Sequence, residues 1–460
     1  SIIRENLILI RNEGMEPCIV DSDTVRLNDH VFLRFSNGKW TIAKVSKKCQ
    51  TKYCKKVMQI EDLVGKRYGS VFEIHEQKLI GTKDNDLNCN LEADFNEVIK
   101  APDDGVMKND NRNLFDDQTA QSLTQKDIEK MRNGGLRGKE IIQSLIKNSE
   151  TFKAKTEFSK AKWIERKAKK HIIKFRVEKI TAYDLCNYNI YKNPFKACGL
   201  RGDSLAVLLG NANVESGAVA LVFDDLMGIV IATVLERVGK DGLVIAPYHA
   251  PSLNVESVEH LNLSEKQKYH NLIRIPSSQI DGEGKGCLSP MKREDLHGVT
   301  LGKVDPEAVE TSLRRYREEI RAKKLSEKVE AEFIEGRKQR LQRFQMRHTA
   351  EELKAIFRNK FDCLVIATKC DPLESLKALF PYLLPCKNFA VFCEFQEPLV
   401  ECFKWAKERE DIVNVKMADY WHREYQVLEG RTHPEMNMSS TGGFVLAGIK
   451  VIATKDPRPV

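Results

Sequence analysis

The sequence lacks any long apolar run. Its most apolar region, residues 205–238, is interrupted by Glu215, Asp224 and Asp225. A membrane-spanning helix needs about 18 or more consecutive apolar residues, so none is predicted and we expect a soluble protein. The opening SIIRENLILIRNEG surrounds a short apolar core with charges and has no small-residue cleavage site, so we also expect no signal peptide.

The sequence also lacks paired cysteine motifs. Its 12 cysteines are scattered without a Cys-x-x-Cys pair, and Cys49 and Cys54 have no histidine partners nearby. Structural zinc sites and disulfide frameworks both depend on regular spacings. Free thiols in a reducing compartment are therefore predicted, and no metal site.

Positive charge is concentrated in one short segment. Residues 151–176 hold ten basic and two acidic residues, a net +8 that equals the formal charge of the whole chain. A solvated helix face is the common explanation of a charge run, but such faces usually carry both signs. We therefore predict contact with the phosphates of a nucleic acid. The basic residues are Lys153, Lys155, Lys160, Lys162, Arg166, Lys167, Lys169, Lys170, Lys174 and Arg176. Trp163 lies among them and could stack on a base, although packing against Ile164 is the stronger expectation.

Apolar periodicity divides the chain into three parts. Residues 1–105 contain short alternating strands such as HVFLRF and KWTIAKV, which predict an all-β domain, a small barrel or sandwich. Residues 106–171 have helical periodicity and form a basic connector. From 172 to 460, beginning with IIKFRVEKI, apolar strands alternate with helices, which predicts an α/β domain with a doubly wound, mostly parallel sheet.

Two segments depart from this alternation. Between about 275 and 350, a Gly/Ser/Pro-rich loop precedes a charged stretch, 311–348, that predicts one long solvated insertion helix. The ending YQVLEGRTHPEMNMSSTGGFVLAG predicts an antiparallel hairpin at the sheet edge. A mainly parallel sheet ending in an antiparallel strand is the layout of class I S-adenosylmethionine-dependent methyltransferases.

The stretch VFDDLMGIVIATVLERVGKDG, residues 222–242, has the outline of a cofactor site. An acid at the end of the strand should precede glycines at alternate positions, because the cofactor approaches the backbone there. Counting from Asp224 gives Leu226, Gly228 and Val230, so one glycine of three is present. The next strand ends APYHA, without the carboxylate that would hold the ribose hydroxyls.

The loop after the fourth strand departs from the methyltransferase pattern as well. Methylation of a base nitrogen calls for an Asp-x-Pro or Asn-Pro-Pro type loop, and CLVIATKCDPLESL has Asp371-Pro372 several residues late and without an aromatic companion. Together the three losses predict a degenerate cofactor site, marked by Asp224 and Gly228. We assign no catalytic residue and no bound cofactor to this chain.

Several runs together resemble the family of non-catalytic subunits of eukaryotic tRNA (adenine-58-N1-)-methyltransferase. They are DNRNLFDDQTAQSLTQKDI, IIQSLIKNSETFKAKTEFSKAKWIERKAKK, FCEFQEPLVECF, YQVLEGRTHP and TGGFVLAG. The run from Asn148 to Phe158 is the most specific of them. The resemblance is weaker over residues 172–362 and carries no function for the insertion.

The resemblance implies a barrel, a helical connector and a Rossmann-like domain. It also implies a homologous catalytic partner that binds S-adenosylmethionine, assembly as a heterotetramer of two plus two, tRNA as the bound molecule and a nuclear location. It implies that Lys369 lies near the partner's active site. Arg423 and Arg431, on the C-terminal hairpin, are candidates for the same neighbourhood, with a role in the subunit interface left open.

Two other function classes stay open on the residues alone. One is an autonomous S-adenosylmethionine-dependent RNA methyltransferase with a divergent site. The other is a general RNA-binding factor without a methyltransferase partner. Binding of the methyl donor to the isolated chain would favour the first, and failure to co-purify with a second Rossmann subunit would favour the other.

Overall fold

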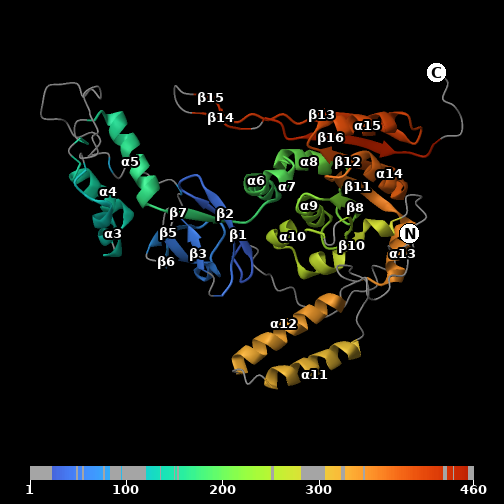
Figure 1. Cartoon of the computed structure of the whole chain (residues 1–460), viewed down its shortest axis with the longest axis horizontal. Coiled ribbons are helices and arrows are strands. Elements are labelled where there is room, and N and C mark those ends of the chain that lie inside the picture. The colour runs from blue at the N-terminus through green and yellow to red at the C-terminus, as the bar shows by residue number, and fades with distance from the viewer. Residues whose placement is uncertain are drawn as a thin grey trace. The chain divides into compact units, whose positions relative to one another are not determined.

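The structure is a computed structural model with two compact units, Ser1–Lys179 and Ile180–Val460 (Figure 1). Each unit is described by itself. The described residues are 23–47, 50–53, 56–75, 78–82, 87, 95, 121–134, 136–149, 151–152, 155–249, 253–280, 306–322, 327–345, 348–427, 432–438 and 440–453.

An antiparallel sheet of five strands forms the centre of the first unit. Its order is β2-β1-β7-β5-β6. Leu33, Phe35, Phe72 and Phe175 fill its core. The all-β expectation is confirmed as a sheet, and among the described residues no ladder joins β2 to β6. The strands are β1 (His30–Phe35), β2 (Trp40–Lys44), β5 (Val71–His75), β6 (Lys78–Gly81) and β7 (Lys174–Glu178), beside a separate ribbon of β3 (Gln50–Tyr53) and β4 (Lys56–Gln59) and the short η1 (Ile60–Leu63).

Strand β7 differs from the predicted domain division at residue 172. The sequence places this segment at the start of the α/β domain, but the structure places it between β1 and β5. Phe175 and Val177 are fully buried and alternate with half-buried polar residues. A strand with one apolar and one polar face suits an antiparallel sheet that covers a single core, whereas the buried strands of a doubly wound sheet are apolar on both faces.

The connector lies between β6 and β7, and its described residues form three helices. They are α3 (Gln125–Asn133), α4 (Gly138–Lys147) and α5 (Glu157–His171). Ile142, Phe152, Ile164 and Ala168 make a small core between α4 and α5. Gly138 allows the start of α4 to lie close to the end of α5, because a Cβ at position 138 would lie 2.6 Å from Ile172 Cγ1.

A mainly parallel sheet forms the centre of the second unit, as predicted, and it has seven strands among the described residues. Its order is β10-β9-β8-β11-β12-β16-β13, parallel from β10 to β12, with β16 antiparallel to both of its neighbours. The strand order reverses between β8 and β11, and open α/β sheets bind ligands beside such a reversal, at the carboxyl ends of the strands. The strands are β8 (Val219–Asp224), β9 (Leu243–Tyr248), β10 (Leu272–Pro276), β11 (Phe361–Ala367), β12 (Leu383–Cys393), β13 (Ile412–Asp419) and β16 (Phe444–Lys450).

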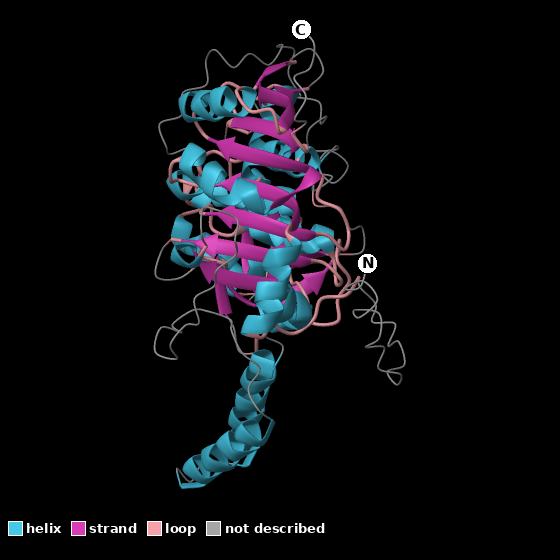
Figure 2. Cartoon of the chain, turned by 90° about the vertical axis from the view of Figure 1, so that its right-hand side faces the viewer, coloured by secondary structure: helices cyan, strands magenta, loops and turns pink. Residues whose placement is uncertain are grey.

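Helices cover both faces of this sheet (Figure 2). They bury an apolar core in which Phe223, Leu364, Leu376 and Phe389 take part. This arrangement confirms the methyltransferase-type α/β fold. The helices are α6 (Ala182–Lys192), α7 (Pro194–Ala197), α8 (Gly202–Asn211), α9 (Ile229–Val238), α10 (Glu256–His260), α13 (Ala350–Asn359), α14 (Pro372–Leu379) and α15 (Gln396–Lys407), with the short turns η3 (Gln267–Asn271), η4 (Ser277–Gln279) and η6 (Phe380–Tyr382).

The charged insertion contains two helices, α11 (Pro306–Ala322) and α12 (Glu327–Gln345), and not the single helix predicted for 311–348 (Figure 1). The Arg337 guanidinium lies 5.4 Å from the centre of the Tyr316 ring, so the two helices pack on each other. Ile320 is 3% exposed. A helix with apolar residues on one side needs a cover, and the second helix supplies it.

The described residues contain neither a membrane-spanning helix nor a cluster of metal-ligating side chains. No helix there combines the length and apolar character needed to cross a bilayer. No group of three or more His, Cys, Asp or Glu side chains there could hold a metal ion. Cys186, Cys198, Cys363, Cys370, Cys386, Cys393 and Cys402 are free thiols.

Candidate functional site

Asp224 ends β8 and serves the backbone around it. Its side chain is buried, one carboxylate oxygen accepts from the Leu226 amide at 2.6 Å, and the other accepts from the Ile231 amide at 3.0 Å. Burial raises the pKa of this carboxyl to about 6, against the lowering effect of those hydrogen bonds. Asp224 therefore ties the loop to the first turn of α9.

Gly228 precedes α9 with φ +72° and meets the chain's own backbone. A Cβ on Gly228 would lie 2.6 Å from the Asn254 carbonyl oxygen and 3.1 Å from Val255 Cα. Leu226 and Met227 are buried beside it, and the Met227 carbonyl accepts from the Ser257 amide at 3.2 Å. A side chain at position 228 would therefore collide with the chain's own backbone.

The end of β9 carries a histidine where a ribose-binding acid would be expected. The His249 ring packs edge-on against Phe223 at 5.1 Å between centroids and its Nδ1 shares a hydrogen bond with Ser277 Oγ. Leu226 and Val230 are buried where glycines would be needed, and no carboxylate ends β9, so this arrangement does not fit S-adenosylmethionine.

The retained Asp371-Pro372 pair begins a helix. The Asp371 carboxylate accepts from the Leu373 amide at 2.8 Å as the N-cap of α14, and Pro372 takes the first helical position. Both are favoured residue types at those positions. The pair has a structural reason here that requires no bound base.

A cavity of about 550 Å³ opens beside the ends of β11 and β12. Lys369 lines it and is exposed, and its backbone amide lies 3.4 Å from an Asp225 carboxylate oxygen. Cys198 and Cys393 also line it, and burial raises the pKa of both thiols. Since the thiolate is the nucleophile, neither cysteine is activated for chemistry.

Arg423 belongs to an arm that follows β13. The arm includes a ribbon of β14 (Tyr425–Gln426) and β15 (His433–Pro434), in agreement with the predicted C-terminal hairpin. Arg423 Nη1 donates to Ser440 Oγ at 3.2 Å. Three residues were expected near the partner's active site. Of these, Lys369 lines the cavity, Arg423 lies in the arm, and Arg431 lies outside the described residues.

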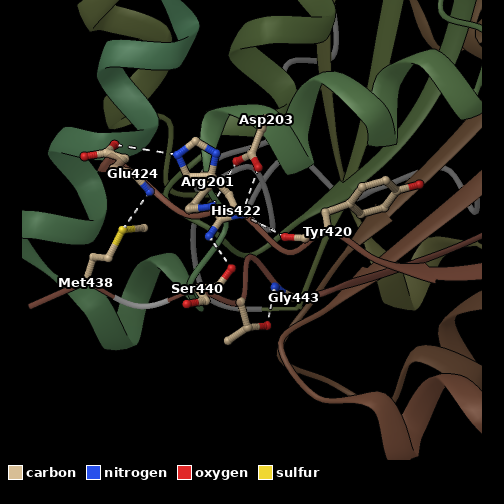
Figure 3. A network of polar contacts seen from close by, with 9 residues as sticks. Arg201, Asp203, Tyr420, His422, Glu424, Met438, Ser440 and Gly443 are labelled. Carbon is tan, nitrogen blue, oxygen red and sulfur yellow. Dashed lines mark hydrogen bonds and ion pairs between the residues drawn. The ribbon is translucent and has the colours of Figure 1, made fainter. Parts of the chain in front are cut away.

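Arg201 fixes the base of this arm (Figure 3). Its guanidinium donates to the Ser440 carbonyl at 2.8 Å, to the Tyr420 carbonyl at 2.7 Å and to Asp203 at 2.8 Å. The side chain of Arg201 is 13% exposed. No local pattern pointed to this role, since the two carbonyl partners lie 239 and 219 residues away along the chain.

The predicted basic residues divide into several groups. Lys162, Arg166 and Lys170 are exposed on α5, whereas Lys160 on the same helix is 5% exposed. Lys167 lies over the Trp163 ring at 5.2 Å. The others are Lys155, partly buried before α5; Lys174, in β7; Arg176, in β7 and 3.9 Å from Glu178; Lys153, outside the described residues; and Lys169, whose side chain also lies outside them.

Lys162, Arg166 and Lys170 recur every fourth residue, and we call them the basic row. Neighbours four residues apart lie about 6 Å apart along a helix axis. Ile164 and Ala168, by contrast, are buried. The core therefore holds one side of α5 and leaves the basic row to solvent. Fourth-residue spacing is visible in the sequence and would have selected these three together with Lys174, which lies in β7 and not on the helix.

The chain is similar to known proteins along most of its length. The pattern of the Gcd10p family matches residues 24–286. The tRNA (adenine(58)-N(1))-methyltransferase non-catalytic subunit of Dictyostelium discoideum is 30% identical over 436 residues, covering 94% of this chain and 80% of that protein. The subunit of the same name from Mus musculus is 27% identical, covering 95% and 89%.

Among solved structures, a SAM-dependent O-methyltransferase from Thermotoga maritima matches with a TM-score of 0.44 and 11% identity, over 94% of this chain and 97% of that one. The fold assignment rests on the strand order and not on this likeness. By the extent of the family match, the chain belongs to the Gcd10p family.

Proposed function

We propose that this chain is the non-catalytic, tRNA-binding subunit of a heteromeric tRNA (adenine-58-N1-)-methyltransferase. The names of its relatives support the assignment. The observation that carries it is the loop after β8, where the buried side chains of Leu226 and Val230 stand at two of the three positions that need glycine. The donor binds, in this proposal, to a homologous catalytic partner that keeps its glycines.

The basic row supplies the attraction for tRNA. Lysine and arginine contact phosphates and release counterions, which gives affinity without reading sequence. The row lies on a capped helix, since Thr156 Oγ1 accepts from the Ser159 amide at 3.3 Å. Its charges are therefore held at fixed spacing along the helix.

The remaining parts of the proposal concern assembly. Lys369, Arg423 and Arg431 are proposed to lie near the partner's active site, with two copies of each subunit in the complex. Native mass spectrometry of the purified complex tests the stoichiometry, and a mass other than two plus two would contradict it. A nuclear location is proposed on the resemblance alone, and imaging of the tagged chain tests it.

Omission of subunits tests the central claim. Both subunits together should form N1-methyladenosine in tRNA, each alone should not, and this chain should raise tRNA affinity. Calorimetry of the isolated chain with S-adenosylmethionine should show no heat of binding. Micromolar binding there would instead support an autonomous methyltransferase.

A further inference from the structure

The cavity beside the ends of β11 and β12 has the size and the place of a small-molecule site. Its volume of about 550 Å³ lies within the roughly 300–1,000 Å³ of ligand pockets. It opens at the carboxyl ends of parallel strands, next to the reversal between β8 and β11, where open α/β sheets bind ligands. Leu226, which stands where S-adenosylmethionine would need glycine, forms part of its wall. The cavity therefore suits a ligand of another class.

The walls of this cavity are largely apolar and include an exposed aromatic ring. Phe395 follows β12, lines the cavity and is 62% exposed. Phe392 lines it as well and is buried in the sheet. Apolar walls with an accessible ring favour a flat apolar body, such as a base, that lies against the ring. The other apolar lining residues are Leu226, Pro372, Leu373 and Pro398.

Carboxylates outnumber ammonium groups around the same cavity. Glu394, Glu401 and Asp371 line it and are exposed, and Lys369 supplies the one ammonium among the described lining residues. Burial raises the pKa of the Cys198 thiol, Lys369 lowers it and Glu394 raises it, so both charges lie near the same thiol. A matching ligand has a positive charge on its apolar body and a single negative group beside it.

A nucleotide of N1-methyladenine has this combination. Methylation of that nitrogen leaves the purine ring positively charged at neutral pH, whereas the ring of unmodified adenine is neutral. A cationic ring is attracted by carboxylates and by the face of an aromatic side chain, and the phosphate of the nucleotide is attracted by lysine. An arginine side chain of another protein has the flat cation but no negative group for Lys369. The charges therefore favour the nucleotide.

We propose that this cavity binds the N1-methyladenine nucleotide, with its ring against Phe395, its positive charge near Glu394 and Glu401, and its phosphate at Lys369. This inference rests on the proposed function, in which the complex forms N1-methyladenosine. It adds a product-binding site to the subunit that does not bind the methyl donor. The carboxylates give the site its preference for the methylated base over the unmethylated one.

Calorimetry of the full chain with N1-methyladenosine monophosphate and with adenosine monophosphate tests the site. The methylated nucleotide should bind roughly tenfold more tightly. Phe395→Ala should weaken its binding about 2- to 30-fold, the range for a cation over an aromatic ring. Glu394→Gln combined with Glu401→Gln should remove most of the preference. Lys369→Ala should weaken binding of the nucleotide but not of the nucleoside. Phe333→Ala, at an exposed ring of α12, is the control and should change nothing.

Three results would overturn the product site. They are equal binding of the two nucleotides, equally tight binding of arginine amide, which would indicate a docking site for a protein cation, and displacement of the methylated nucleotide by S-adenosylmethionine. Should Phe395→Ala not fold, saturation-transfer NMR on the unaltered chain provides a second measurement. Transfer to the N1-methyl protons supports the site, and its absence at millimolar nucleotide contradicts it.

The proposed function is tested separately from this site. If both subunits are needed to form N1-methyladenosine in tRNA but the methylated nucleotide does not bind this chain, the product site is wrong and the proposed function stands. If N1-methyladenosine forms without this chain, the proposed function is wrong, whatever the cavity binds.

Discussion

The Asn254 carbonyl oxygen occupies the position next to Gly228 where a side chain would begin, 2.6 Å from an ideal Cβ. In a cofactor-binding loop, glycine leaves room for a ligand. In this chain it leaves room for the chain's own backbone. Glycine at position 228 therefore serves the packing of the backbone, and we expect its substitution to lower the stability of the folded chain.

Gly228→Ala should destabilise the second unit. The φ of +72° at position 228 should by itself lower the free energy of unfolding of the alanine variant by about 1–2 kcal/mol. Displacement of the Asn254 backbone adds to that loss. Chemical denaturation measures the loss. The matched control is Gly210→Ala, because Gly210 lies in α8 with nothing within 4 Å of its ideal Cβ. That variant should gain about 0.5–1 kcal/mol, and equal effects of the two substitutions would contradict the packing argument.

Alanine at Lys162, Arg166 and Lys170 should weaken tRNA binding and lower its salt slope by about 2, at roughly 0.7–0.9 for each lost phosphate contact. Lys167 is left unaltered in this variant because it lies over the Trp163 ring. Filter binding between 50 and about 200 mM salt measures the slope. Alanine at the exposed Lys240, Lys266 and Lys404 removes equal charge elsewhere and should change the slope less.

Asp224 should give stability a characteristic pH dependence. Burial raises its pKa to about 6 in the folded state, above the ordinary value, so the folded protein binds this proton more tightly than the unfolded one. Stability should therefore fall by roughly 3 kcal/mol as pH rises from about 4 to 6, and change no further from this group above about pH 7.

Urea denaturation of Asp224→Asn across that pH range measures the effect. The variant should lack the fall, whatever its stability at a single pH. Asp241→Asn removes a carboxylate from an exposed turn and serves as the matched control. A parallel pH profile for Asp224→Asn and the unaltered chain would exclude the assignment.

Arg201→Ala should loosen the base of the arm. It leaves the Tyr420 and Ser440 carbonyls without their charged donor, and hydrogen bonds to charged groups contribute about 1.5–3 kcal/mol each. Hydrogen exchange of residues 440–443 should become faster, while exchange in β8 stays slow. Lys377→Ala removes an exposed ion pair with Glu374 and should leave the arm unchanged, so a similar response to both would argue against the anchoring role.

The alternation of apolar strands and helices was enough to predict the second sheet and its antiparallel end. The sequence also shows that Leu226 and Val230 stand where a cofactor-binding loop needs glycines. The packing of Gly228 was not predictable. It depends on Asn254, which follows the neighbouring strand β9 and comes into contact only in the folded chain.

Charge alone identified the basic segment but not its exposed side. Lys160 and Lys162 are equivalent in composition, yet one is buried and the other exposed, because the core of α4 and α5 determines which side of the helix faces inward. For β7, the alternation of Phe175 and Val177 with polar residues indicates a strand with one apolar face. Its partners, β1 and β5, come from pairing across long sequence separations that no local pattern encodes.

The position of β7 also dictates an order of folding. Arg34 of β1 and Glu178 of β7 form an ion pair at 3.0 Å across a separation of 144 residues. Because β7 lies between β1 and β5, the first sheet cannot close on a ribosome until the three connector helices have been synthesised. Such long-range pairing is slow. The helix α5 is therefore translated before β7, the central strand of the first sheet. A truncation within the connector would leave the N-terminal strands without that strand.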